Sequence, residues 1–322
     1  MPTPIRISSR PDLIPAVERV MIDPIIKKIE ALKTQHNAVI AAHNYVTPDI
    51  FAAADLTGDS LALASMARET EADVIVLAGV YFMAETAKIV NPSKTVLIPD
   101  VRAGCSLADG ITAADVRRLR QQYPGIPVVT YVNTSAEVKA ESDICCTSGN
   151  AVAVVESLGV EKVIFLPDQY LGRYVASQTD TEVILWEGSC EVHERFTGEE
   201  IAQLRTDFGG LAVIVHPECP PDVIAEADYV GSTEGIISWV KKNRPSRLMM
   251  ITECSMADNV ALEVPDVEMI RPCNLCPHMK RISLFNILYS LETLTTRVEV
   301  EPGIADRARG AVERMLAVGR NE

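Results

Sequence analysis

Three cysteines recur at nearly equal spacing in this chain of 322 residues. Cys105 follows Ala-Gly, Cys190 follows Gly-Ser and Cys276 follows Asn-Leu, at separations of 85 and 86 residues. Three thiolates do not complete a tetrahedral structural zinc site, but they can bind three irons of a cubane iron–sulfur cluster and leave the fourth iron open. Because an open iron is a Lewis acid, the cysteines predict a metal-dependent enzyme.

The third cysteine has a neighbour that complicates its assignment. Cys273 and Cys276 form a CxxC motif, which is typical of half a zinc site or of a redox pair. The sequence contains no second CxxC to complete a zinc ribbon. We therefore predict that Cys276 is the ligand and that Cys273 is a bystander or a redox partner. The remaining cysteines have no equivalent in the repeated stretches, namely Cys145, Cys146, Cys219 and Cys254.

Polar side chains precede each cysteine in a fixed order. Short apolar runs, typical of buried strands in a parallel sheet, cover residues 38–42, 126–130 and 211–215. Each run leads into two polar residues spaced by two positions, which share one face of an extended segment. These pairs are His43 and Tyr45, Tyr131 and Asn133, and His216 and Glu218. Glu218 is the only carboxylate among them, and partial desolvation would suit it to general acid–base catalysis.

A serine follows each pair at a predicted helix start. Ser60, Ser148 and Ser232 lie 14 or 15 residues after the second member of their pair. Helix N-termini favour anions because their N–H groups are unpaired and the helix dipole is positive there, although a serine at this place is more often a simple N-cap. Matched serines in three units predict a substrate that carries several carboxylates, or carboxylates and phosphate.

The elements that must position these residues also recur. Further apolar runs follow in each copy, at residues 74–78 and 95–98, 163–166 and 182–186, and 248–251 and 267–270. They alternate with helical patterns, which predicts right-handed βαβ crossovers and parallel sheets. Ligands bind outside the carboxyl ends of such strands, so three sheets facing a common centre would gather these side chains. The predicted fold class is α/β, with three αβα sandwich units.

We expect these units to form one compact body without flexible linkers. The first covers residues 1–118 and includes an N-terminal helix that starts at Asp23 and Pro24. The second covers residues 119–205. The third covers residues 206–322 and includes helices over residues 282–294 and after Pro302. The terminal helices are expected to pack against the units and close them.

Composition and charge exclude several classes of function. Hydrophobic residues make up 48% of the chain and charged residues 23%, which indicates a well-buried globular protein. A net charge of −14 argues against nucleic acid or an anionic membrane as a partner. We find no long apolar run and no signal-peptide pattern, and eight irregularly spaced cysteines do not resemble a secreted disulfide framework. We expect a cytoplasmic protein.

Together the motifs resemble those of quinolinate synthase, over about residues 38–290. In chain order they are Ala42-His-Asn-Tyr45, Gly58-Asp-Ser60, Gly104-Cys-Ser106, Tyr131-Val-Asn133, Thr147-Ser-Gly-Asn150, Val215-His-Pro-Glu218, Gly231-Ser-Thr-Glu-Gly235 and Cys276-Pro-His-Met-Lys280. The resemblance implies three pseudo-symmetric αβα domains around a central [4Fe–4S] cluster. It also implies condensation of iminoaspartate with dihydroxyacetone phosphate to quinolinate, the pyridine precursor of NAD, with loss of water and phosphate.

The resemblance further implies roles for single residues. The cluster ligands would be Cys105, Cys190 and Cys276. The residues that move protons would be Tyr45, His216 and Glu218. The residues that hold carboxylates or phosphate would be His43, Ser60, Tyr131, Asn133, Ser148, Ser232 and Thr233. His193, three residues after Cys190, also matches a family position and is grouped with the substrate-binding residues.

One position departs from the family pattern. Some members carry CxxCxxC before the last ligand, whereas Ile270 stands here at the first of those positions. A redox switch built on the longer motif is therefore not expected. Cys273 and Cys276 could still form a disulfide when no cluster is bound.

Other functions remain open from the sequence alone. An aconitase-type hydro-lyase would use the same open iron to dehydrate a hydroxy acid. An iron–sulfur sensor would need a partner surface or a DNA-binding element, and the acidic chain shows neither. A zinc-bound structural protein is a further alternative. The expected partners are the two small-molecule substrates, with possible coupling to an L-aspartate oxidase or dehydrogenase that supplies the imine.

Overall fold

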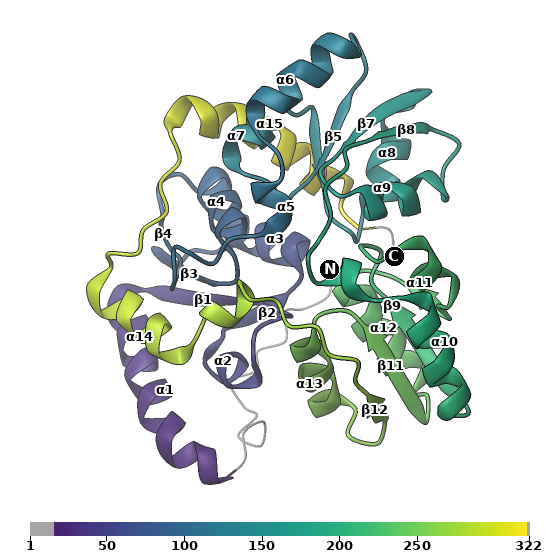
Figure 1. Ribbon diagram of the computed structural model, residues 1–322. Coiled ribbons are helices and arrows are strands. Elements are labelled where there is room, and N and C mark those ends of the chain that lie inside the picture. Colours follow the sequence, from purple (N-terminus) through teal and green to yellow (C-terminus); the bar gives the residue numbers. More distant parts are fainter. Residues whose placement is uncertain (1–15, 321–322) are drawn as a thin grey trace.

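The computed structural model describes residues 16–320, which contain three α/β units (Figure 1). Each unit has one four-stranded parallel sheet, in the order β2-β1-β3-β4, β6-β5-β7-β8 and β10-β9-β11-β12. The strands are β1 (Ala38–His43), β2 (Leu56–Gly58), β3 (Val74–Ala78), β4 (Thr95–Leu97), β5 (Val128–Tyr131), β6 (Ile144–Cys146), β7 (Lys162–Leu166), β8 (Glu182–Leu185), β9 (Leu211–Val215), β10 (Tyr229–Val230), β11 (Arg247–Ile251) and β12 (Glu268–Ile270). The predicted α/β fold class with three αβα sandwiches is confirmed, and all nine apolar runs form strands.

Helices connect the strands within each sheet and also link one sheet to the next. They are α2 (Pro48–Ala53), α3 (Ser60–Glu69), α4 (Tyr81–Val90), α5 (Ser106–Asp109), α6 (Ala113–Gln122), α7 (Ala136–Ala140), α8 (Ala151–Ser157), α9 (Gln169–Ala176), α10 (Gly198–Asp207), α11 (Pro221–Ala225), α12 (Thr233–Asn243) and α13 (Cys254–Glu263). Of these, α5, α6 and α10 connect one sheet to the next. Two short 3₁₀ turns are η2 (His193–Arg195) and η3 (Met279–Arg281). Because the connections are helical crossovers, the strands of a sheet run parallel and their carboxyl ends lie at one edge.

The N-terminal helix differs from the prediction in where it begins. Helix α1 spans Ala16–His36 and contains Pro24 in its interior, so the predicted start at Asp23 is wrong. A proline inside a helix cannot donate to the carbonyl four residues earlier, which belongs to Val20. Val20 is 77% exposed, so water can satisfy that carbonyl and the helix continues past the proline.

The C-terminal helices return to the first two units. Helix α14 (Leu284–Thr293) packs on α1 and contacts β3, whereas α15 (Pro302–Val318) packs on α7, β6 and α4. In Figure 1 the yellow end of the chain runs behind the second unit. The two predicted C-terminal helices are confirmed, and they link the first unit to the second.

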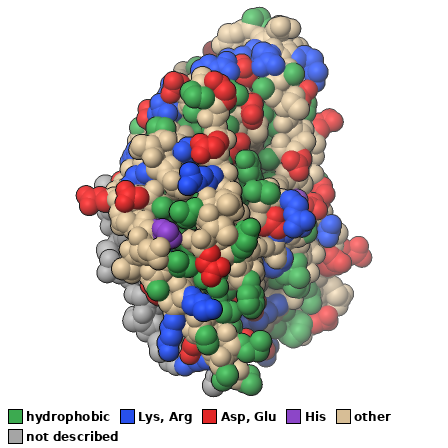
Figure 2. All heavy atoms as spheres, turned by 90° about the vertical axis from the view of Figure 1, so that its left-hand side faces the viewer, with side chains coloured by type: hydrophobic (Ala, Val, Ile, Leu, Met, Phe, Trp, Pro, Cys, Tyr) green, Lys and Arg blue, Asp and Glu red, His purple; other side chains and the backbone are tan. Residues whose placement is uncertain are grey.

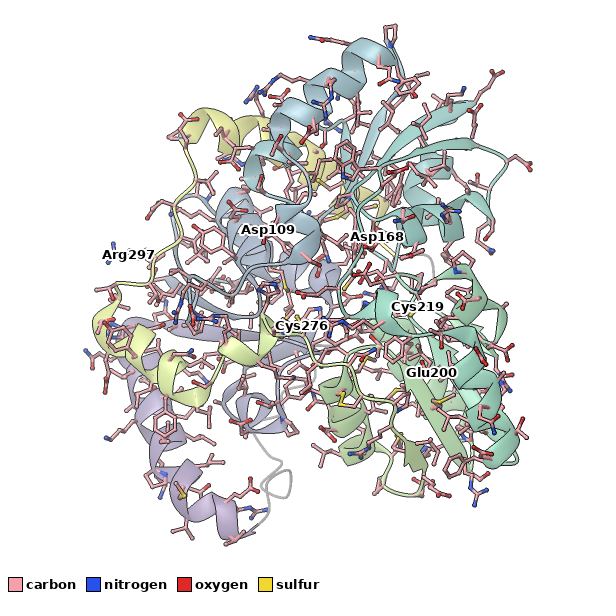
Figure 3. All side chains as sticks on the ribbon, viewed as in Figure 1. Asp109, Asp168, Glu200, Cys219, Cys276 and Arg297 are labelled. Atoms are coloured by element: carbon pink, nitrogen blue, oxygen red, sulfur yellow. A yellow bond between two sulfur atoms is a disulfide. The ribbon has the colours of Figure 1, made fainter. Side chains whose placement is uncertain are left out.

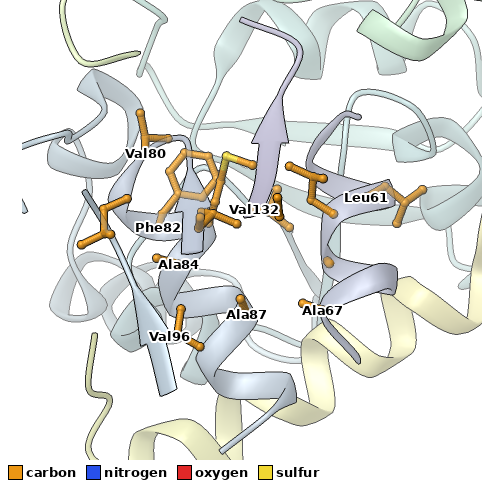
Figure 4. Packing of buried hydrophobic residues seen from close by; sticks show 14 of the residues in the cluster. Leu61, Ala67, Val80, Phe82, Ala84, Ala87, Val96 and Val132 are labelled. Carbon is orange, nitrogen blue, oxygen red and sulfur yellow. The ribbon is translucent and has the colours of Figure 1, made fainter. Parts of the chain in front are cut away.

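The hydrophobic core is divided unevenly among the units. One large cluster joins the first two units and the C-terminal helices, a smaller cluster lies mainly in the second unit, and two clusters lie mainly in the third. Figure 4 shows part of the large cluster, in which Leu61 and Phe82 of the first unit lie near Val132 of the second. Tyr45 packs against both this cluster and one cluster of the third unit.

Charged side chains of both signs are interspersed on the face seen in Figure 2. Within residues 16–320, no helix combines the length and the apolar character that a membrane span requires.

Candidate active site

The three units surround one cavity of about 720 Å³, counting its solvent-open part. Of the predicted site residues, those that line it are His43, Tyr45, Ser60, Cys105, Tyr131, Asn133, Ser148, Cys190, His193, His216, Glu218, Thr233 and Cys276. Ser232 is the predicted residue that does not line it. Since the lining comes from every unit, no single unit forms the site. Figure 3 shows Cys276 near the centre of the molecule, with Glu200 and Arg297 far from it on opposite sides.

Each predicted ligand begins a single helical turn. The carbonyl of each cysteine accepts a hydrogen bond from the amide four residues later, at 3.0 Å for Cys105, 3.0 Å for Cys190 and 3.1 Å for Cys276. Each thiol also accepts hydrogen bonds from the amides two and three residues later. The equal spacing in the sequence therefore corresponds to one turn geometry used three times.

A second backbone contact fixes each cysteine segment from its other side. The acceptor is the carbonyl of the residue two positions before the cysteine. The donor is the first amide of the helix that follows the third strand of the unit, namely α4 after β3, α9 after β7 and α13 after β11. The donor and acceptor pairs are Tyr81 and Ala103 at 2.7 Å, Gln169 and Gly188 at 2.9 Å, and Cys254 and Asn274 at 3.2 Å. Each cysteine is thus tied to a strand end of its own sheet.

The three thiols suit a metal group. All three are free. Burial raises the pKa of Cys105 to about 12, and it also raises the pKa values of Cys190 and Cys276, while the turn amides act in the opposite direction. The thiols are therefore protonated at neutral pH until a metal displaces the proton. Soft sulfur donors with N–H groups directed at them are the environment of iron–sulfur ligands.

Cys273 does not pair with Cys276. It forms a disulfide with Cys254, with Cα atoms 5.1 Å apart. The sequence leaves open whether Cys273 pairs with Cys276, and in the structure it does not, because Cys254 opens α13 beside Asn274 and brings its sulfur to Cys273. Cys276 remains free to act as a ligand.

A chain of hydrogen bonds runs through the cavity wall. The Tyr131 hydroxyl donates to Glu218 Oε1 at 2.5 Å, and Glu218 Oε2 lies 2.8 Å from His193 Nδ1. His193 Nε2 lies 3.0 Å from Thr252 Oγ1, which is 2.6 Å from the Tyr45 hydroxyl. The chain joins residues of all three units and connects two tyrosines through a carboxylate and an imidazole, which are groups that can relay a proton.

The charge states in this network follow from burial and pairing. Burial alone raises the pKa of Glu218, but His193 and the other hydrogen-bonding neighbours lower it by more, so this carboxylate is ionised. Burial lowers the pKa of His43 to about 4 and of His216 to about 3, with Glu218 opposing both shifts. These two imidazoles are neutral at pH 7. His216 does not bond to Glu218; it stacks on His193, with ring centroids 4.8 Å apart, and its Nε2 lies 3.2 Å from Ser148 Oγ.

The three predicted helix-start serines occupy different positions. Ser60 is the first residue of α3, and Ser148 lies in a turn two residues before Asn150, the N-cap of α8. Only Ser232 is an N-cap, and its hydroxyl accepts a hydrogen bond from the amide three residues later. Its oxygen is therefore used within the protein, while the adjacent Thr233 lines the cavity.

Two buried atoms of the cavity lining have no hydrogen-bond partner within the described residues. They are Asn133 Oδ1 and His216 Nδ1. A buried polar group without a partner costs about 1–3 kcal/mol. A bound polar molecule would remove this cost, so the two atoms indicate where a ligand bonds.

A second set of metal-binding atoms overlaps the network. Cys190, His193 and Glu218 each offer one atom, and these atoms lie within 4.8 Å of one another. Glu218 and His193 already bond to each other. We therefore assign them to the hydrogen-bond network and not to a metal. The site as a whole is compatible with metal binding.

Two further residues support the site and were missed from the sequence. Thr252 joins Tyr45 to His193. Glu253 lies 2.9 Å from Lys280 Nζ and accepts a hydrogen bond from the Cys276 amide at 3.3 Å. Both Thr252 and Glu253 directly follow β11, just as the predicted pairs follow or end the first strand of each unit. Applying the same rule to the other long strand of each sheet would have found them.

An α/β fold with a central cavity lined by free thiols and an acid–base network defines an enzyme site that can hold a metal. The family described as "Quinolinate synthetase A protein" matches residues 27–317. Quinolinate synthase 2 of Mesorhizobium japonicum is 66% identical over 307 residues, which cover 95% of both chains. The quinolinate synthase of Agrobacterium fabrum is 60% identical over 95% of this chain and 89% of the relative. The quinolinate synthase of Xylella fastidiosa is 60% identical over 93% of this chain and 89% of the relative. The chain belongs to the quinolinate synthase family.

Proposed function

We propose that this protein condenses iminoaspartate with dihydroxyacetone phosphate to form quinolinate, with loss of phosphate and water, and so supplies the pyridine ring for NAD biosynthesis. Family membership supports this reaction. The observation that carries the proposal within the molecule is the arrangement of three free thiols in matched turns around one cavity.

Cys105, Cys190 and Cys276 are proposed to hold a [4Fe–4S] cluster by three of its irons. When bound, the cluster supplies an open iron that polarises a substrate oxygen without net redox chemistry. The protein contributes the turn amides at the thiols and the buried lining, which excludes water from the charged groups.

Substrate carboxylates and phosphate are proposed to bind among polar groups of the lining. Asn133 and His216 support this role because each has a buried atom without a partner. His43, His193, Ser60, Ser148, Tyr131 and Thr233 also face the cavity. Ser232 would contribute through the N-terminus of α12 that it caps, since its hydroxyl is already bonded.

Proton transfers are proposed to pass along the network centred on Glu218. As an ionised carboxylate held between Tyr131 and His193, Glu218 can accept a proton during dehydration and ring closure. Tyr45 lies at the other end of the network, bonded to Thr252. His216 is neutral and stacked on His193, which suits it to orient a substrate group or share a proton.

We also propose how the chain is divided and where it acts. The three sheets support functional units at residues 1–118, 119–205 and 206–322, although α14 and α15 pack on the first two units. A cytoplasmic location and coupling to an L-aspartate oxidase or dehydrogenase would fit an unstable imine substrate. Co-purification with such an enzyme and faster quinolinate formation in its presence would test the coupling.

The decisive test is anaerobic reconstitution with iron and sulfide, followed by an assay for quinolinate from the two precursors. We expect quinolinate together with a brown chromophore containing four irons per chain. An aconitase-type hydro-lyase would instead dehydrate a hydroxy acid and form no quinolinate. Zinc without iron or sulfide would contradict the cluster.

Glu218→Gln tests the acid–base role separately. We expect turnover to fall by about 10²–10⁴-fold, the usual worth of a general acid or base, while iron content stays unchanged. Unchanged turnover would remove Glu218 from the mechanism.

A further inference from the structure

Arg320 follows α15 and forms an ion pair with Asp59, which lines the cavity. The Asp59 side chain is 7% exposed and that of Arg320 is 31% exposed. Asp59 caps α3 through its other oxygen, Oδ1, which accepts a hydrogen bond from Ala62. The ion pair therefore uses Oδ2 alone and leaves the helix cap intact.

The second and third units hold Arg320 in this place. Asn150 Nδ2 donates to the carbonyl of Gly319 at 2.9 Å, which fixes the turn after α15. A Cβ on Gly149 would lie 3.5 Å from Arg320 Nε and 3.2 Å from Ser232 Oγ. The guanidinium thus packs over a glycine and beside the cap of α12, at the point where segments of all three units meet.

The cavity wall carries negative charge, although the proposed substrates are anions. Its lining includes the carboxylates of Asp59, Glu191, Glu218 and Glu253, and among residues 16–320 no lysine or arginine lines it. Glu234 lies nearby: burial and then Asp59 raise its pKa, and Arg320 acts in the opposite direction. A partly buried carboxylate without a partner repels anions over several ångströms.

We propose that Arg320 is a positioning residue for the anionic substrates. By pairing with Asp59 it cancels a negative charge in the cavity wall, and it leaves the positive N-terminal turn of α3, with Ser60, to face a carboxylate or phosphate. This inference rests on the proposed function. Arg320 acts through Asp59 and does not itself line the cavity.

Steady-state kinetics of the reconstituted enzyme test the inference. Arg320→Ala should raise the KM of the precursors and the Kd of quinolinate about tenfold, the effect of 1.4 kcal/mol of lost interaction, with kcat changed less than about twofold. Arg320→Lys keeps the charge and should stay near wild type. Adding Asp59→Asn to Arg320→Ala should restore KM, because asparagine keeps the helix cap and removes the charge.

Arg314→Ala is the matched control, since Arg314 is an exposed arginine of α15 that bonds to the carbonyl of Asp143. It should leave KM unchanged. If Arg320→Ala leaves KM and Kd unchanged in an active enzyme, or if the double variant does not recover, the inference is overturned. A wild-type protein that neither forms nor binds quinolinate would overturn the proposed function as well. A parallel loss of kcat and melting temperature without rescue would show a structural role only.

Discussion

In the first two units, a backbone hydrogen bond connects the cysteine segment to the neighbouring helix, from Tyr81 to Ala103 and from Gln169 to Gly188. In the third unit the same contact, from Cys254 to Asn274, is reinforced by a disulfide one residue away. Glu253 adds an ion pair with Lys280 and accepts a hydrogen bond from the Cys276 amide.

The difference follows the distribution of the core. The first two units share a large hydrophobic cluster, and α15 packs on both. The third unit has clusters of its own, although Cys276 packs against the large cluster, and its ligand segment also has local cross-links. Equivalent turns around the cysteines are thus held in place by different forces in different units.

The largest effect is expected at the thiols themselves. Cys276→Ser, like Cys105→Ser and Cys190→Ser, should abolish the brown chromophore and activity, because a hydroxyl does not replace a thiolate as an iron ligand. Cys273→Ser should keep the cluster. Iron and sulfide analysis after anaerobic purification measures both, and the opposite pattern would show that Cys273 is the ligand.

Glu253→Gln should selectively weaken the attachment of the segment that carries Cys276 in the third unit. Removing the charge breaks the ion pair with Lys280, which keeps its hydrogen bonds to Tyr45 and Ser255, and weakens the contact to the Cys276 amide. We expect a loss of about 2–3 kcal/mol in the free energy of unfolding, the upper range for hydrogen bonds to a charged group. Cluster occupancy should fall with it. Urea denaturation and iron content are the measurements.

The matched change in the second unit is Asp168→Asn. Asp168 holds the same N-cap position as Glu253, is fully buried and has one oxygen without a partner. Burial and then Glu218 raise its pKa, and asparagine keeps the side-chain oxygen that caps α9. We expect a change below about 1 kcal/mol. Equal losses in both variants would contradict the different anchoring of the two segments.

Removing the disulfide should destabilise the protein somewhat less than Glu253→Gln does. Cys254→Ser or Cys273→Ser opens a link across 19 residues, and we expect a loss of about 2 kcal/mol, at the lower end for disulfides. The cluster and activity should remain at 25 °C. Thermal denaturation with and without reductant should show the loss in the wild type as well, whereas a reductant-independent melting temperature would argue against the bond in solution.

The backbone contact of the second unit can be tested by a change at Gly188. A Cβ on Gly188 would lie 2.4 Å from the carbonyl oxygen of Pro167, so Gly188→Ala should cost about 1–2 kcal/mol, as overpacking does. It should also shift Cys190. The equivalent Asn274→Ala in the third unit should cost less. Chemical denaturation of both variants compares their free energies of unfolding. An unchanged value for Gly188→Ala would show that the segment around Cys190 can shift without loss of stability.

The sequence by itself determined the repeating pattern and the position of the candidate site residues at the ends of its strands. Apolar runs of four or five residues specify buried strands wherever they occur, and strand ends carry the polar pairs and cysteines to one edge. Family membership and the three-sheet fold followed from these local signals.

Only the tertiary structure decided which of these residues contact one another. Cys273 bonds to Cys254 rather than Cys276, and Glu218 bonds to His193 rather than His216. The contact of Arg320 with Asp59 links residues 261 positions apart. Such partners depend on how the sheets are oriented around the cavity, and no local periodicity encodes that orientation.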